Sequence, residues 1–143
     1  MLGPEKEIIS SYVESGQVRI VYQPMLDHGN ASLNAHAAAD CAGRQSVDAF
    51  WELHDQFYAN QDELWSADRA YFVQAAVNLG LDQAAFEGCY DSGDGHVTVT
   101  ELDSIRRGEG IFNRPTFFIN DLLLIGSQPF EVFSQYIEAV LEG

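Results

Sequence analysis

The sequence predicts an α/β fold in which a short strand, a block of helices, a β-hairpin and a final helix follow one another. Residues 18–22 form a β-branched run, which is typical of a strand. Residues 32–107 carry repeated helix-start and helix-stop signals. Near the C-terminus, the apolar runs 116–119 and 122–125 flank an Asn-Asp turn. This pattern predicts a tight hairpin.

Helices are expected at both ends of the chain and throughout its middle. Residues 4–16 place apolar side chains at helical spacing and end at a glycine. Residues 100–107 form a further predicted helix, and residues 129–141 a final amphipathic one. The expected caps of the middle block are Ser32, Ser46, Ser66 and Asp82 as N-caps, with Gly43 and Gly80 as C-terminal stops.

The same pattern predicts two apolar clusters. One face of the final helix should carry Phe130, Phe133, Tyr136, Ile137 and Val140. The helical block should bury Phe50, Trp51, Leu53, Phe57, Phe72 and Val73 together. His54 and Asp55 lie within this block, but consecutive helical residues point to different faces and no serine motif accompanies them. We therefore expect no catalytic role for that pair.

Composition excludes two classes of partner. The chain of 143 residues suits one domain, and 46% hydrophobic residues suffice for a core. Seven basic against 22 acidic residues give a net charge of −15, so this acidic protein should repel nucleic acid and anionic membrane surfaces. No stretch approaches 18 apolar residues, so no membrane insertion of this chain is expected.

One segment imitates a calcium-binding loop. In "YDSGDGHVTVTEL", residues 92–101 follow the spacing of an EF-hand around Gly95. Tyr90 stands where the first aspartate ligand belongs, and only Asp94 and Glu101 remain as carboxylates in register. A polar turn that joins two helices explains the same residues, so no metal site is predicted.

Pro115 opens the first strand of the hairpin. A proline at the start of a strand donates no ladder hydrogen bond, and X-Pro is the peptide bond for which the cis form is most accessible. Gly110 provides flexibility shortly before it. Arg114-Pro115 is therefore a candidate cis bond, and an ordinary trans proline that opens an edge strand is the alternative.

Four stretches carry a resemblance to a known family. "GIFNRPTFFINDLLLIGSQPFEVF" resembles the cis-proline segment, hairpin and final helix of DsbA-like thiol-disulfide oxidoreductases. "AHAAADCAGRQSVDAFWELHDQFYANQDELW" and "AAVNLGLDQAAFEGCYDSG" resemble their helical insertion, and "ESGQVRIVYQP" the strand before it. The resemblance implies a thioredoxin-like fold with an all-helical insertion. Residues 1–143 would be one domain, with core elements at 1–24 and 109–143 and the insertion at 32–107.

The family's Cys-x-x-Cys and the strand that leads to it are not found in this sequence. Residues 18–22 and the hairpin would flank that missing strand in the sheet, which leaves a slot. Such open edges invite pairing with another chain, so a homo-oligomer through the unfilled edge is one expectation.

The two cysteines, Cys41 and Cys89, cannot replace the redox motif. They are 48 residues apart, and Cys41 falls at a helix C-terminus, where the dipole disfavours a thiolate. The resemblance implies that the helices that carry them pack together. A structural disulfide, expected if the protein is exported, and two buried free thiols both remain open.

The resemblance implies dithiol-disulfide exchange on protein or peptide thiols, without a cofactor. Asn113, Arg114 and Pro115 would hold the substrate as an added strand, and this chain alone would be inactive because it has no catalytic residues. The family implies a periplasmic or secreted location, and a cytoplasmic one stays open.

Two other functions remain open at this point. Kappa-type glutathione transferases and their isomerase relatives share a "GIF…P…F" stretch like that at residues 110–117. A non-catalytic thioredoxin-fold module that binds extended peptides needs no residue that this chain lacks. Insulin reduction and glutathione binding would separate the three functions.

Overall fold

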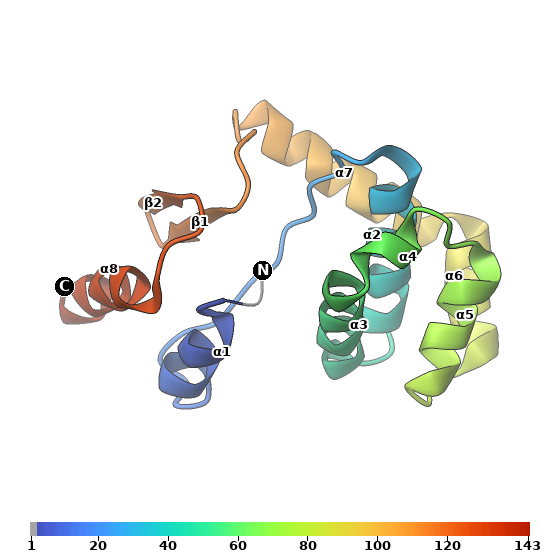
Figure 1. Ribbon diagram of the computed structural model, residues 1–143, viewed down its shortest axis with the longest axis horizontal. Coiled ribbons are helices and arrows are strands. Elements are labelled where there is room, and N and C mark those ends of the chain that lie inside the picture. The colour runs from blue at the N-terminus through green and yellow to red at the C-terminus, as the bar shows by residue number, and fades with distance from the viewer. Residues whose placement is uncertain (1–2) are drawn as a thin grey trace. The chain divides into compact units, whose positions relative to one another are not determined.

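A computed structural model describes residues 3–143 (Figure 1). The chain divides into two compact units. The hairpin unit consists of Met1–Tyr22, described from Gly3 onward, and Gly110–Gly143. The helical unit is Gln23–Glu109. The predicted α/β class is confirmed, because helices form most of the chain and the hairpin unit contains a small sheet.

The hairpin unit begins with the predicted N-terminal helix. It consists of α1 (Glu5–Ile8) followed directly by a π-helical turn, η1 (Ile9–Val13). The Tyr12 hydroxyl lies 2.6 Å from Ser134 Oγ and donates to Glu138 Oε1 at 2.8 Å. Both partners belong to α8 (Phe130–Glu142), the predicted final helix. The first and last helices of the chain are thus fastened together across the apolar contacts between them.

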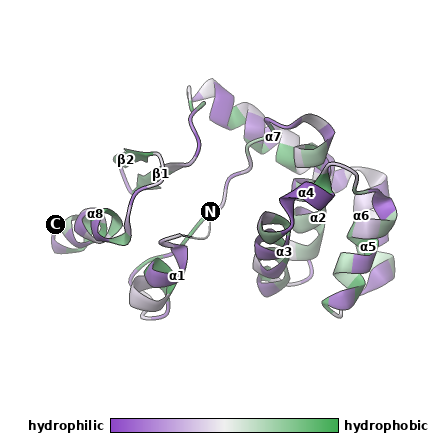
Figure 2. Cartoon of the chain, viewed as in Figure 1, coloured by the Kyte–Doolittle hydropathy of each residue, from purple (hydrophilic) through white to green (hydrophobic). Residues whose placement is uncertain are grey.

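The predicted hairpin is confirmed. Strands β1 (Thr116–Ile119) and β2 (Leu122–Ile125) pair antiparallel, with Ile119 opposite Leu122. Asn120 takes a positive φ of 51°, as a tight hairpin turn requires. β2 is strongly hydrophobic, whereas α8 mixes hydrophobic and hydrophilic residues (Figure 2). One sheet face packs on α8 through Leu124 and Phe117, and Phe133 and Ile137 of α8 are buried there as predicted.

The prediction of a strand at residues 18–22 is wrong, because these residues form no strand in the structure. The alternation is present, since Val18 and Ile20 pack against the apolar cluster of the hairpin unit while Val21 is 73% exposed. Extended residues become a strand only when a neighbour completes the ladder of hydrogen bonds. Within residues 3–143, the sheet contains only β1 and β2, so this segment runs without a ladder partner.

The helical unit contains six helices. The small side chains of α2 let the neighbouring helices approach it closely. Three of its alanines are wholly buried: Ala37, Ala38 and Ala42. Among the described helices, none is long and apolar enough to cross a membrane. The bounds are α2 Gly29–Gly43, α3 Val47–Ala59, α4 Gln61–Leu64, α5 Arg69–Asn78, α6 Gln83–Ser92 and α7 Asp94–Gly108.

Two of the four predicted N-caps are confirmed. Ser46 accepts from Ala49 N, and Asp82 accepts from Ala85 N at 2.7 Å. The other two are wrong. Ser32 lies inside α2, which begins at Gly29, and its Oγ accepts from His28 N. Asp68, not Ser66, caps α5, because its carboxylate accepts from Tyr71 N.

The core of the helical unit differs from the prediction in two residues. Leu53, Phe57, Phe72 and Val73 are buried as expected, and Phe86 and Tyr90 of α6 join them. Phe50 and Trp51 are only partly buried. They are consecutive residues of α3, so their side chains project in different directions, and both lie at the margin of the packed face. The predicted cluster is therefore correct at its centre and wrong at this end.

Candidate functional site: the proline loop and the disulfide

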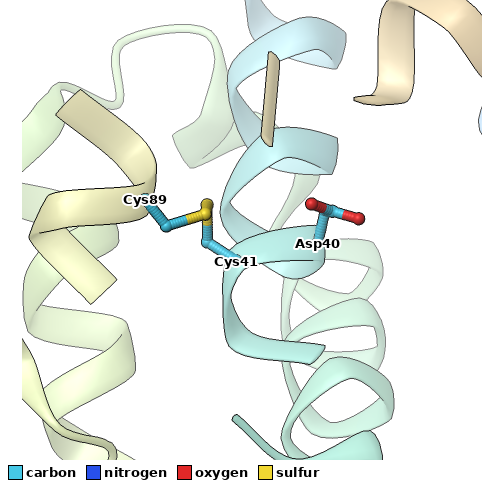
Figure 3. Close-up of side chains that lie close together, drawn as sticks. All are labelled: Asp40, Cys41 and Cys89. Atoms are coloured by element: carbon cyan, nitrogen blue, oxygen red, sulfur yellow. A yellow bond between two sulfur atoms is a disulfide. The ribbon is translucent and has the colours of Figure 1, made fainter. Parts of the chain in front are cut away.

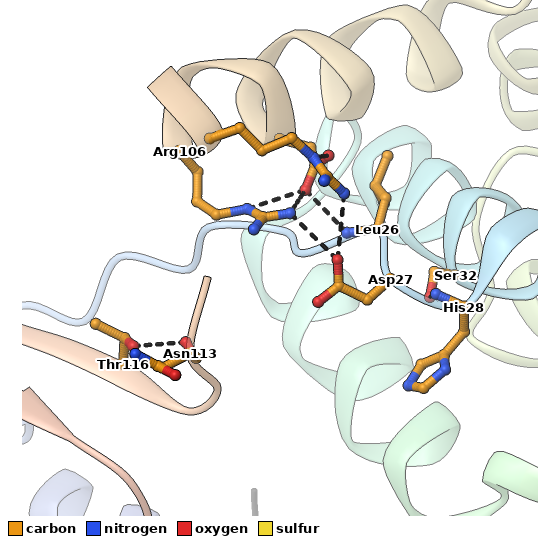
Figure 4. Close-up of polar contacts among 9 residues, drawn as sticks. Leu26, Asp27, His28, Ser32, Arg106, Asn113 and Thr116 are labelled. Atoms are coloured by element: carbon orange, nitrogen blue, oxygen red, sulfur yellow. Dashed lines mark hydrogen bonds and ion pairs between the residues drawn. The ribbon is translucent and has the colours of Figure 1, made fainter. Parts of the chain in front are cut away.

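The predicted substrate residues lie in the loop between α7 and β1. Gly110 has a φ of +77°, and the Arg114-Pro115 peptide bond is cis. The Thr116 hydroxyl donates to Asn113 O at 2.6 Å (Figure 4), and Gly126 N donates to Pro115 O at 2.8 Å. The loop is therefore held both to the start of β1 and to the residue that follows β2.

Asn113 and Arg114 are exposed, and Pro115 is partly buried. Within the described residues, β1 has β2 as its only ladder partner. An extended peptide can add itself to such an edge through main-chain hydrogen bonds. The arrangement therefore offers polar side chains beside a strand edge, which suits binding of extended chains, and no group in it is a nucleophile.

The two cysteines form a disulfide in the helical unit. It joins α2 to α6, with the Cα atoms 5.8 Å apart (Figure 3). Both cysteines of the chain are consumed in it, so neither offers the thiolate that thiol-disulfide exchange requires as a nucleophile. A carboxylate oxygen of Asp40 lies close to the two sulfurs, and Asp40 Oδ2 accepts from Arg44 Nε at 2.9 Å. With the sulfurs bonded to each other, these residues form a crosslink beside an ion pair and not a metal-ligand set.

The segment that imitates a calcium loop is largely helical. α7 begins at Asp94, six residues before the predicted helix start at Thr100. Asp94, Thr98 and Glu101 therefore lie along a helix, where their oxygens cannot wrap around one ion as a 12-residue loop does. Gly95 instead meets α2, because a Cβ at this position would lie 2.7 Å from Ala37 O.

His54 and Asp55 contact each other, although consecutive helical residues were expected to diverge. His54 Nδ1 lies 3.0 Å from Asp55 Oδ1, and the His54 side chain is 7% exposed. Its ring also packs against Trp51 and Tyr58, with centroid distances of 5.3 and 4.6 Å. This is the environment of a histidine packed among aromatic rings, and no catalytic role is assigned to it.

Sequence reasoning missed a cluster of four charged residues, here called the charge clamp: Asp27, Asp103, Arg106 and Arg107. Asp103 lies at the centre, where its Oδ1 accepts from Arg106 and its Oδ2 accepts from Arg107 Nε at 2.6 Å. Asp27 Oδ1 accepts from Arg106 Nη2 at 3.4 Å and from Arg107 Nη2 at 3.2 Å. Two carboxylates thus face two guanidinium groups, and the cluster is neutral overall.

The central pair of the charge clamp is withdrawn from water. The side chains of Asp103 and Arg106 are 9% and 3% exposed. Burial alone would raise the pKa of Asp103. Hydrogen bonds from Arg106, Arg107 and Leu26 N outweigh this effect and lower the pKa of Asp103 to about 2. Asp103 is therefore a fixed anion at all ordinary pH values. Its spacing to Arg106 and Arg107, three and four residues, was the sequence signal that could have found this part.

Comparison with known proteins places these features in a family context. The sequence profile of a family described as "Thioredoxin" matches residues 4–139. The chain is 19% identical over 140 residues to the Bacillus subtilis (strain 168) protein "Disulfide bond formation protein D". That match covers 96% of this chain and 63% of the relative.

Two other relatives come from Salinispora. "Na(+)/H(+) antiporter NhaA 1" of Salinispora arenicola is 29% identical over 140 residues, which cover 96% of this chain and 20% of the relative. "Na(+)/H(+) antiporter NhaA 3" of Salinispora tropica is 31% identical over 117 residues, 80% of this chain and 17% of the relative. The chain therefore spans a fifth or less of these two relatives. No solved structure matches it.

Proposed function

We propose that this chain supplies the substrate-binding part of a thiol-disulfide oxidoreductase that acts on protein thiols. The chain belongs to the DsbA-like thioredoxin-fold family. The family match over residues 4–139, which includes the proline loop, is the observation that carries this proposal. The similarity to a disulfide bond formation protein supports the same reaction class. Asn113, Arg114 and Pro115 would contact the substrate.

The exchange reaction needs a reactive dithiol that this sequence does not contain. In that reaction a thiolate attacks one sulfur of a disulfide, forms a mixed disulfide and releases the other sulfur as a thiolate. Cys41 and Cys89 are already bonded to each other and lie in the helical unit. The proposed role of this chain is therefore to hold the substrate, while a thiolate other than Cys41 or Cys89 makes the attack.

A binding experiment tests this role directly. The full chain is titrated into a fluorescein-labelled, extended peptide that contains one blocked cysteine, and anisotropy is followed. Arg114→Ala should weaken binding by roughly the tenfold that corresponds to one lost polar contact. Arg19→Ala is the matched control, because Arg19 is also an exposed arginine of the hairpin unit. Equal affinities for the wild type and both variants would count against the proline loop as the binding element.

The disulfide favours a second candidate function, a peptide-binding module without catalysis, because it leaves this chain no free thiol. Insulin reduction by the chain alone would contradict both proposals in their present form. Saturable glutathione binding would favour the kappa-type transferase relation instead. Peptide binding without either of these activities fits both proposals.

Self-association through the hairpin remains a proposal as well. The face of the sheet opposite α8 exposes Phe118, Leu123 and Ile125 by 57%, 50% and 48%. Exposed apolar strands with an open edge favour pairing between copies. Sedimentation velocity over a range of concentrations should therefore detect a dimer that Leu123→Lys weakens. A wild type that stays monomeric at all concentrations would contradict this.

A further inference from the structure

The charge clamp lies where the chain enters and leaves the helical unit. This unit begins at Gln23 and ends at Glu109, and Asp27 and Arg107 lie within a few residues of these two limits. Two further bonds join the same segments. Leu26 N donates to Asp103 Oδ1 at 3.0 Å, and Gln23 Nε2 donates to Leu102 O at 3.2 Å. The segment that precedes α2 is thus tied to the C-terminal half of α7.

The hairpin unit consists of two chain segments, residues 3–22 and 110–143, that the whole helical unit separates in the sequence. The entropy lost when two segments come together grows with the length of the connection between them. A connection whose ends are already tied to each other behaves as a short loop. The charge clamp therefore shortens the effective chain length between the two segments of the hairpin unit, although its residues belong to neither segment.

We propose that the charge clamp is a conformational device that closes the base of the helical unit, so that the two segments of the hairpin unit assemble as if a short loop joined them. The four residues of the charge clamp act indirectly: they stabilise the hairpin unit through chain connectivity. They also restrain the C-terminal end of α7, from which the chain continues to the proline loop. The inference is independent of the proposed function, because it makes no use of substrate or thiols.

Burial makes the central pair well suited to this role. A buried ion pair that loses one partner leaves an uncompensated charge in the interior, which is strongly destabilising. Asp103 and Arg106 are in this situation, whereas Arg107, with its side chain 46% exposed, is held less stringently. Opening the clamp should therefore be a rare event in the wild type and a frequent one when Asp103 loses its charge.

Hydrogen exchange of the full, oxidised chain, read by mass spectrometry, tests the inference. In Asp103→Asn, amides of residues 23–28 should exchange at least about tenfold faster, because this segment loses its anchor. Amides of the hairpin and of α8 should accelerate as well. Amides of α5 and α6, which lie elsewhere in the helical unit, should keep their rates. If the clamp were only a local contact, exchange would accelerate near residues 23–28 and not in the hairpin and α8.

The matched control is Arg69→Gln. It breaks the bidentate pair between Arg69 and Asp91, which joins α5 to α6 and ties no end of the helical unit. This variant should leave the hairpin unit unchanged. If Asp103→Asn does not fold, Arg107→Gln removes the exposed half of the clamp and should give the same pattern with smaller rate changes.

Three results would overturn the inference. The first is unchanged exchange in residues 23–28, which would mean that the clamp does not hold this segment. The second is acceleration confined to residues 23–28 and α7, with the hairpin unit unaffected. The third is equal acceleration across the whole chain, α5 and α6 included, which would indicate general destabilisation.

Discussion

Gly95 of α7 lies directly against Cys41 of α2. A Cβ built on Gly95 would be 2.8 Å from Cys41 Sγ and 2.7 Å from Ala37 O. Real side chains do not approach so closely, and both neighbours are fixed, one as backbone and one as part of a disulfide. The glycine that gave this segment the appearance of a calcium loop is therefore explained by the close contact between α2 and α7.

Gly95→Ala should destabilise the protein although alanine is the better helix former. The gain in helix propensity is about 1 kcal/mol. Overpacking in a tight contact costs roughly 1–3 kcal/mol and should exceed it, because neither the Ala37 carbonyl nor the Cys41 sulfur can move freely. Urea unfolding at neutral pH measures the net effect as a lower midpoint.

Gly88→Ala is the control for this substitution. Gly88 also lies inside a helix, α6, but nothing stands within 4 Å of the position of its missing Cβ. Here only the propensity gain acts, so the midpoint should rise by an amount equivalent to up to about 1 kcal/mol. A rise for both glycines would mean that α2 and α7 are further apart than described.

The disulfide should contribute strongly to stability. It closes a loop whose ends are 48 residues apart, and the chain-entropy model assigns about 4 kcal/mol to such a loop. The double variant Cys41→Ala/Cys89→Ala should therefore unfold at much lower urea concentration than the oxidised wild type. Reduced wild-type protein should resemble the variant. Equal midpoints with and without reductant would show that the crosslink restrains little.

Burial within α3 separates two large side chains that the sequence pattern treated alike. Leu53 is fully buried, so Leu53→Ala should cost about 2–5 kcal/mol. Trp51 is only partly buried, and Trp51→Ala should cost less than the roughly 3–5 kcal/mol of a core tryptophan. Urea unfolding of both variants measures the two losses, and a loss for Trp51→Ala as large as that of a core tryptophan would contradict the prediction.

Sequence patterns predicted correctly those helix caps that depend only on neighbouring residues. The caps at Ser46 and Asp82 were correct because a side-chain oxygen and an amide three residues later suffice to form them. The cap at Ser66 was wrong because Asp68 competes for the same helix start, while Ser66 Oγ donates to Glu63 O instead. Where two capping residues lie close together, sequence alone does not choose between them.

Signals that depend on distant partners were harder to interpret. Residues 18–22 have the composition and alternation of a strand, yet a strand also needs a neighbour. In the charge clamp, the Asp103, Arg106 and Arg107 spacing was visible in the sequence. Asp27, by contrast, joins from the other end of the helical unit, and no local pattern links it to α7. The proline loop was thus predictable from the sequence, whereas the charge clamp was not, because it joins residues at opposite ends of the helical unit.

The charge clamp also predicts a specific dependence of stability on pH. The pKa of Asp103 is lowered in the folded protein from 3.8 to about 2, so the folded state favours the charged form. A group whose folded pKa is depressed stabilises the protein fully above its unfolded pKa, and this contribution disappears as pH falls through the folded value. Urea midpoints should therefore decline between about pH 4 and pH 2, with a loss on the order of 2 kcal/mol from this group. Asp103→Asn should be less stable at neutral pH and should decline less steeply over this interval, because asparagine does not titrate. Parallel curves for the two proteins would mean that Asp103 is not the group whose protonation weakens the fold.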